Sequence, residues 1–269
     1  MPMDLVDLQK TAKKIRADVL TMLSEAGSGH LGGSLGLADI FTALYFDVLN
    51  INPENPELEN RDRLVLSIGH VAPVLYATLA QRGFFPVEEL LSLRKIGSRL
   101  QGHATTLVPG VEVSTGSLGQ GLSIATGMAL AAKSDNLPWH VFSIHGDGEL
   151  QEGQIWEAAM TAGKYKLNNL IAIVDRNKLQ IDGKTETVMP LEPLANKWLS
   201  FGWQVIETNG NHMESVLTAL KMATSSEEKP TLIIANTTMG KGVRSIENNP
   251  EWHGKSPSKE QLKSFLEEL

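Results

Sequence analysis

The hydrophobic positions at the start of the chain predict a long amphipathic helix. Apolar residues recur at three- and four-residue steps from Leu5 to Met22, the spacing of one helix face. The pattern stops at Gly27-Ser28-Gly29, a cluster that breaks helices. A second helix is expected from Ala38 to about Val48, and a polar, proline-containing loop follows over residues 52–60.

Farther along the chain, short apolar segments alternate with segments that have helical spacing. The expected strands are Leu64–Ile68, Val141–Ile144, Leu170–Val174, Trp203–Ile206 and Leu232–Ala235. The expected helices are Pro73–Gln81, Gln120–Lys133, Ile155–Lys164, Leu191–Leu199 and Met213–Ala223. This alternation predicts an α/β fold, a doubly wound and mainly parallel sheet with helices on both faces.

The organisation of the chain is expected to be simple. No internal repeat or low-complexity linker divides the sequence. We therefore expect a single domain over residues 1–269, with a C-terminal tail from about residue 240 and a short helix from Ser258.

Composition narrows the classes of function. The 269 residues are 42% hydrophobic and 20% charged, which is typical of a soluble globular protein. A net charge of -7 argues against binding to nucleic acid or to an anionic membrane. The absence of cysteine excludes disulfides and thiolate sites. No signal peptide or membrane span is visible, so a cytoplasmic protein is expected.

Glycines and polar side chains collect where the expected strands end. These segments are Gly69-His70 and residues 145–148, 175–177 and 236–242. In open parallel sheets, ligands bind beyond the carboxyl ends of the strands. The sequence therefore predicts a binding site at this edge of the sheet.

Two of these strand ends predict a magnesium site. Asp147 lies between two glycines, and Asn177 follows the next expected strand thirty residues later. Their side-chain oxygens, with the main-chain carbonyl of Leu179, form an oxygen set suited to Mg²⁺. Gly-Asp-Gly alone would be interpreted as a plain turn, and the placement of Asn177 favours the metal. A nicotinamide-binding site is a poorer fit to this segment, because Gln151 stands where the nicotinamide fingerprint needs its third glycine.

Four segments together resemble the transketolase family over nearly the whole chain. Residues 146–158 and 170–183 are similar to its thiamine diphosphate motif. Ser28–Gly36 resembles the N-terminal segment of that family. Gly102-His103 with residues 109–121 is similar to its next block, and Trp252–Lys255 to its late histidine segment.

The resemblance implies roles for individual residues. Mg²⁺, or Ca²⁺ or Mn²⁺ as substitutes, would be held by Asp147, Asn177 and Leu179. The diphosphate of thiamine diphosphate would contact His70, Gly148, Asn177 and His253. The cofactor rings would lie near Gly116 and Leu118, and Asp175 would lie beside the metal loop. Glu152 would lie at a subunit interface, in an acidic network between two cofactors.

Four histidines next to glycines have chemistry that suits the implied reaction. His30, His103 and His253, with His70 nearby, would line the channel for the ketose donor. Cleaving that donor requires a proton to be taken from a hydroxyl and later returned. Imidazole titrates near neutral pH and can do both.

The family resemblance also implies a partner. In transketolases, the glutamate that activates the cofactor belongs to a pyrimidine-binding domain that this sequence does not contain. We expect a second subunit that carries the pyrimidine-binding and C-terminal domains, in an α₂β₂ assembly that transfers a two-carbon ketol unit between sugar phosphates. The alternatives are the α subunit of a 2-oxo acid dehydrogenase and a non-catalytic cofactor-binding subunit. The sequence does not identify the ketose donor or the aldose acceptor.

Overall fold

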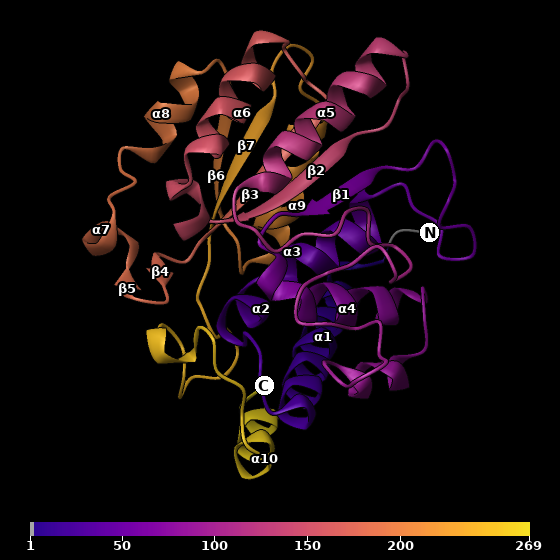
Figure 1. The fold of residues 1–269 in the computed structure, drawn as a ribbon, viewed down its shortest axis with the longest axis vertical. Helices are drawn as coiled ribbons and strands as arrows, with labels where there is room; N and C mark the ends of the chain where they lie inside the picture. The colour runs from indigo at the N-terminus through magenta and orange to yellow at the C-terminus, as the bar shows by residue number, and fades with distance from the viewer. Residues whose placement is uncertain (1–2) are drawn as a thin grey trace.

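A central parallel sheet organises residues 3–269, the part of the chain that this computed structural model describes. Figure 1 shows the strands in the middle of the ribbon with helices packed around them. Within these residues, no helix is long and apolar enough to cross a membrane.

The main sheet has five parallel strands in the order β1-β2-β3-β7-β6. Their bounds are β1 Arg63–Leu66, β2 Val141–Gly146, β3 Leu170–Arg176, β6 Gln204–Asn209 and β7 Thr231–Asn236. A separate hairpin pairs β4 Leu179–Gln180 with β5 Gly183–Lys184. All five strands of the main sheet correspond to expected apolar segments, with ends that differ by at most three residues.

Alternate residues of each strand enter two separate hydrophobic cores. Phe142 and Ile144 pack in the core formed with the helices α1 (Leu5–Ala26), α3 (Ala38–Ala43), α4 (Ala72–Arg82) and α9 (Met213–Thr224). Val141, on the same strand, packs in the core formed with the helices α5 (Gln120–Ser134), α6 (Gly153–Lys164) and α8 (Leu194–Ser200). Because both faces of the sheet are covered, the inner strands β2, β3 and β7 are buried along almost their whole length. The expected doubly wound α/β fold is therefore confirmed.

The helices follow the expected pattern closely. The N-terminal helix α1 spans Leu5–Ala26, with the Asp4 carboxylate accepting the amide of Asp7 and Gly27 ending the helix at a φ of 67°. The other α-helices are α2 Gly32–Gly36, α3 Ala38–Ala43, α4 Ala72–Arg82, α5 Gln120–Ser134, α6 Gly153–Lys164, α7 Thr185–Val188, α8 Leu194–Ser200, α9 Met213–Thr224 and α10 Lys259–Glu268. A π-helical turn, Leu44–Val48, continues α3. The 3₁₀ turns are Gly69–Val71, Val87–Ser92, Gly148–Gln151 and Pro250–Trp252.

One expected helix begins later than predicted, and three short elements were not predicted, each for a local reason. The helix expected over Leu191–Leu199 begins only at Leu194, because the residue before Pro193 is disfavoured in helical conformation. The helices α2 and α7 and the hairpin β4–β5 were not expected, because each is too short for a periodic pattern to develop.

The carboxyl edge of the sheet is covered by segments from both ends of the chain. After β7, the tail packs on α2, and the Gly240 amide donates to the Gly32 carbonyl at 2.9 Å. A side chain at Gly32 would meet the Met239 side chain at 2.6 Å, so glycine permits this close approach. Figure 1 shows the tail and α2 together below the sheet.

Candidate functional site

A cleft of about 350 Å³ lies at the carboxyl ends of β1, β2 and β3. Ten of the twelve expected site residues line it: His30, His70, Leu118, Asp147, Gly148, Glu152, Asp175, Asn177, Leu179 and His253. The other two, His103 and Gly116, pack against each other, and a Cβ at Gly116 would lie 3.4 Å from the His103 ring. The cleft is also lined by Gln151, Gln180 and Ile181, which the sequence motifs did not single out.

Three of the four expected histidines meet in this cleft from distant parts of the chain. The ring centroids of His30 and His70 are 4.8 Å apart, and those of His70 and His253 are 5.4 Å apart. Their positions are fixed by the segment before α2, the 3₁₀ turn after β1 and the tail. The Nδ1 atoms of His30 and His253 are buried and have no hydrogen-bond partner among residues 3–269. These nitrogens are free to bind a polar ligand.

Burial and mutual repulsion keep this histidine cluster neutral. Burial lowers the pKa of His30 to about 4, with His253 adding to the effect. Burial likewise lowers the pKa of His70 to about 3, with His30 as the next contributor. Burial also lowers the pKa of His253. Neutral imidazoles at neutral pH can accept a proton as well as donate a hydrogen bond.

The expected metal ligands converge on one another across neighbouring strand ends. The Asp147 carboxylate accepts the amide of Gly148 at 2.8 Å and that of Lys178 at 2.6 Å. The Asn177 side-chain oxygen accepts the amide of Leu179 at 2.8 Å. Within residues 3–269, no group of three or more His, Cys, Asp or Glu side chains is placed to hold a metal. The expected ligand set differs from such a group, because it contains only one of these side chains, the Asp147 carboxylate, together with a side-chain amide and a backbone carbonyl.

A second buried acidic side chain, Asp175, lies at this edge of the sheet. Asp175 accepts hydrogen bonds from the Thr237 hydroxyl and from the Asn177 amide nitrogen at 2.7 Å. Burial raises the pKa of Asp175 to about 7. Burial also raises the pKa of Asp147 to about 6, although the neighbouring Arg176 opposes the rise. A cation bound nearby would favour the charged forms of both groups.

Arg176 is a functional candidate that the sequence motifs did not single out. Its guanidinium contacts Asp147 at 3.1 Å, Glu186 at 2.8 Å and Glu192 at 2.9 Å. It thereby ties the Asp147 loop to the segment around α7. No spacing rule in the sequence could identify this contact, because the two glutamates reach Arg176 only after the chain folds back.

The cleft fits both groups that the family resemblance implies. Asp147, Asn177 and the Leu179 carbonyl offer only oxygens, which Mg²⁺ prefers. The unpartnered Nδ1 atoms of His30 and His253 lie in the same cleft. Gly148 also lines the cleft, and a Cβ there would crowd the Gln180 side chain at 3.2 Å, so glycine permits the close packing of this turn.

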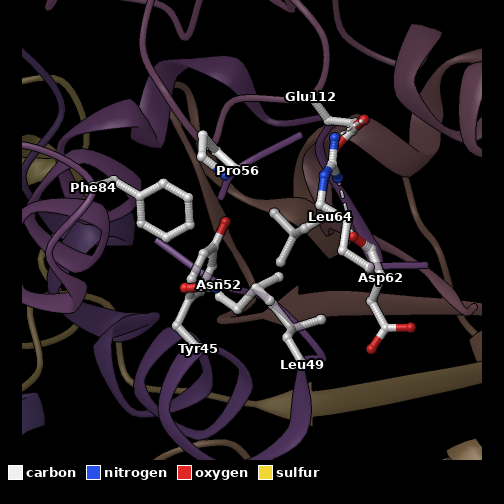
Figure 2. Close-up of a pocket in the computed structure, with 11 residues that line it drawn as sticks. Tyr45, Leu49, Asn52, Pro56, Asp62, Leu64, Phe84 and Glu112 are labelled. Atoms are coloured by element: carbon white, nitrogen blue, oxygen red, sulfur yellow. Dashed lines mark hydrogen bonds and ion pairs between the residues drawn. The ribbon is translucent and has the colours of Figure 1, made fainter. Parts of the chain in front are cut away.

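A second cavity shows by contrast where the candidate chemistry is concentrated. Figure 2 shows Tyr45, Leu64 and Phe84 around this cavity, with Glu112 beside it. Its volume is about 20 Å³, and it is lined by none of the expected site residues. A space of this size holds on the order of one water molecule. The cleft at the carboxyl ends of β1, β2 and β3, which the expected site residues line, is therefore the candidate functional site.

Comparison with known sequences agrees with this geometry. Residues 8–269 match the family described as transketolase, thiamine diphosphate binding domain. The chain is 43% identical over 267 residues to one of the subunits of the apulose-4-phosphate transketolase of Phocaeicola vulgatus, covering 99% of this chain and 95% of that protein. It is 45% identical over 265 residues to the 6-deoxy-6-sulfo-D-fructose transketolase subunit SqwG of Clostridium sp. (strain MSTE9), covering 98% and 96%.

Comparison with solved structures identifies the same fold in a longer protein. The transketolase of Campylobacter jejuni superposes with a TM-score of 0.93 at 38% identity, covering 98% of this chain and 43% of that chain. The chain thus spans less than half of this transketolase and nearly the full length of the two subunit relatives. The sequence match, the shared fold and the cleft at the strand ends agree, and the chain belongs to the transketolase family as its thiamine diphosphate-binding domain.

Proposed function

We propose that this chain is the cofactor-binding subunit of a two-chain transketolase, which transfers a two-carbon ketol unit from a ketose phosphate to an aldose phosphate. The observation that carries the proposal is that His30, His70 and His253 open into the cleft that also contains Asp147 and Asn177. This arrangement would put proton-transfer groups beside the diphosphate and the metal of the cofactor. We do not favour the α subunit of a 2-oxo acid dehydrogenase or a non-catalytic subunit, because the similar subunits are transketolase subunits.

The residues at the strand ends would hold the cofactor and its metal. Asp147, Asn177 and the Leu179 carbonyl would bind Mg²⁺, with Asp175 supporting Asn177 through its 2.7 Å hydrogen bond. His70, His253, Asn177 and the Gly148 amide would contact the diphosphate. When bound, thiamine diphosphate supplies the nucleophilic carbon that accepts the ketol unit.

The histidines would move protons on the sugar. The donor carries a hydroxyl whose proton must leave as its carbon–carbon bond breaks. A neutral imidazole in the cluster of His30 and His253, with His103 nearby, would accept this proton and return it to the acceptor product. Since His103 is exposed, we place it at the entrance of the cleft. His70 would remain next to the diphosphate.

An exposed apolar side chain at the cleft supports a partner subunit. In the β4–β5 hairpin, Ile181 lines the cleft and is 69% exposed. Glu152 is exposed at the start of α6, beside Gly119. A second chain that carries the pyrimidine-binding and C-terminal domains would cover these groups and complete the cofactor site. We propose an α₂β₂ assembly in the cytoplasm, in which this chain contributes one domain over residues 1–269.

We propose a class of substrate for this chain and not an individual sugar. The two relatives are named for apulose 4-phosphate and for 6-deoxy-6-sulfo-D-fructose, which share a ketose end and carry an anionic group. The donor of this chain would likewise be a ketose that carries an anionic group.

Reconstitution with the partner tests this function. The chain would be assayed for ketol transfer with Mg²⁺ and thiamine diphosphate, first alone and then with increasing amounts of the second subunit. We expect no transfer by the chain alone and a rate that rises with partner concentration until it saturates. Full activity without a partner would contradict the two-chain proposal, and an inactive complex with every ketose phosphate tried would contradict ketol transfer.

A further inference from the structure

A buried glutamate, Glu149, is one of the residues that line the cleft. Glu149 follows Asp147 and Gly148 in the 3₁₀ turn after β2, and its side chain is 0% exposed. A buried carboxylate is costly unless hydrogen bonds or an opposite charge compensate for the lost water. The surroundings of Glu149 provide this compensation.

Each oxygen of Glu149 accepts hydrogen bonds from groups that can only donate or that rotate to donate. Oε1 accepts the Ser67 hydroxyl and the Gly119 amide, the latter at 2.8 Å. Oε2 accepts the Gly146 amide at 3.1 Å and lies 3.5 Å from Nδ1 of His145. The backbone amides of Gly119 and Gly146 can only donate, so the position suits a carboxylate and disfavours an amide.

These donors belong to three different segments of the cleft. Ser67 follows β1 and leads into the turn of His70, Gly119 is next to Leu118, and Gly146 is next to Asp147. Glu149 therefore connects the three segments that carry His70, Leu118 and Asp147. Sequence motifs could not reveal this role, because Ser67 is 82 residues away from Glu149.

Glu149 also replaces a missing helix cap. Helix α5 begins after Gly119, which has no side chain that could cap it. Glu149 accepts the Gly119 amide, and Ser67 accepts the Gly121 amide at 3.1 Å. A negative charge at a helix N-terminus is favourable. The start of α5 is thereby fixed relative to β1 and β2.

We propose that Glu149 is a positioning residue that sets the spacing between the β1 turn, the start of α5 and the Gly-Asp-Gly turn, and that it thereby determines how tightly the cleft binds thiamine diphosphate. The inference rests on the proposed function, because it requires this cofactor in the cleft. In Glu149→Gln, the side-chain NH₂ would face the backbone N–H of either Gly119 or Gly146. Two donors cannot form a hydrogen bond with each other, so the segment that contains that glycine would move away. Loss of an outer residue that supports a metal or ligand site costs about 10- to 100-fold in affinity.

The test compares the full chain with its variants in the complex with the partner subunit. The dissociation constant for thiamine diphosphate at saturating Mg²⁺ would be measured by calorimetry. We expect Glu149→Gln to raise it about 10- to 100-fold. The matched control is Glu157→Gln on the exposed face of α6, and it should bind like the wild type. At saturating cofactor, Glu149→Gln should recover a turnover close to that of the wild type, because Glu149 does not act on the sugar.

Hydrogen exchange supplies a readout that does not depend on the cofactor. Peptides that cover residues 113–121 should exchange faster in Glu149→Gln than in the wild type, while peptides from α9 should be unchanged. If Glu149→Gln does not fold, Ser67→Ala removes one donor and keeps the carboxylate, and it should weaken cofactor binding by a smaller factor. Wild-type cofactor affinity in every folded variant would overturn the positioning role alone. A wild-type complex that does not bind thiamine diphosphate would instead overturn the proposed function.

Discussion

The guanidinium of Arg176 lies 3.1 Å from the carboxylate of Asp147, and both side chains are 2% exposed. Arg176 also contacts the more exposed Glu186 and Glu192. The candidate metal ligand is therefore part of a buried ion network that extends to α7. Arg176 compensates the charge of the Asp147 carboxylate, and the network orients this carboxylate.

The metal assignment predicts a loss of cofactor binding when a ligand is removed. Asp147→Ala and Asn177→Ala each take away a side-chain oxygen from the set that would hold Mg²⁺. We expect Mg²⁺-dependent affinity for thiamine diphosphate to fall by more than about 10-fold in both. Calorimetry of the partnered complex would measure the change.

A matched control for these variants lies at the same edge of the sheet. Asn236 is an exposed asparagine at the carboxyl end of β7, outside the cleft. Asn236→Ala should keep the wild-type affinity. Unchanged affinity in both Asp147→Ala and Asn177→Ala would show that the metal is bound elsewhere or not at all.

The buried pair predicts a large effect on stability. Arg176→Met leaves the Asp147 carboxylate buried without its cation, and breaking a buried pair in this way costs about 3–5 kcal/mol of unfolding free energy. Arg99→Met makes the same substitution at a more exposed ion pair with Glu89, with side chains 34% and 27% exposed. That control should cost about 1 kcal/mol or less. Urea unfolding of both variants would measure the difference, and equal costs would contradict a structural role for the buried network.

The histidine cluster predicts a pH-dependent difference in stability. The folded pKa of His70 is lowered to about 3 by burial, from an ordinary value of 6.5. Between these values, the unfolded chain binds a proton at His70 that the folded chain does not, so this residue destabilises the fold increasingly as the pH falls below 6.5. His70→Gln removes this contribution.

The variant and the wild type should therefore be compared across pH. The unfolding free energy of His70→Gln should rise relative to that of the wild type as the pH falls from 6.5 towards 4. The comparison cancels the opposite contributions of Asp147 and Asp175, whose raised pKa values favour the fold at low pH. A difference that stays constant over this range would contradict the buried, neutral state of His70.

The proton-transfer assignment predicts a separation between turnover and cofactor binding. His30→Ala, His103→Ala and His253→Ala should each lower turnover by about 10²- to 10⁴-fold, because each removes a positioned acid or base. Cofactor affinity should fall less than turnover. Steady-state kinetics of the partnered complex at saturating thiamine diphosphate would separate the two effects.

An exposed histidine provides the control for this series. His212 lies before α9 and hydrogen-bonds Ser215 at 2.8 Å, away from the cleft. His212→Ala should keep normal turnover. If all three cleft variants also turned over normally, the histidines would have no role in proton transfer.

The sequence by itself determined the layers of this fold and the place of its site. Strands buried on both faces are apolar over most of their length, so Val141–Ile144 and Leu170–Val174 were visible without a structure. Parallel strands end at the same edge, so Asp147 and Asn177 could be expected to meet there. Both inferences depend only on local pattern and on the direction of the strands.

The tertiary structure alone decided how the site is supported. Glu149 meets Ser67 across 82 residues, Arg176 meets Glu186 and Glu192 around α7, and His30 meets His253 from opposite ends of the chain. Such contacts depend on how the loops return to the sheet edge, and no periodicity in the sequence encodes that path. Hydrogen bonds of this kind form only when packing of the two cores has already brought the segments together, so side-chain type suggests them and only the folded geometry selects them.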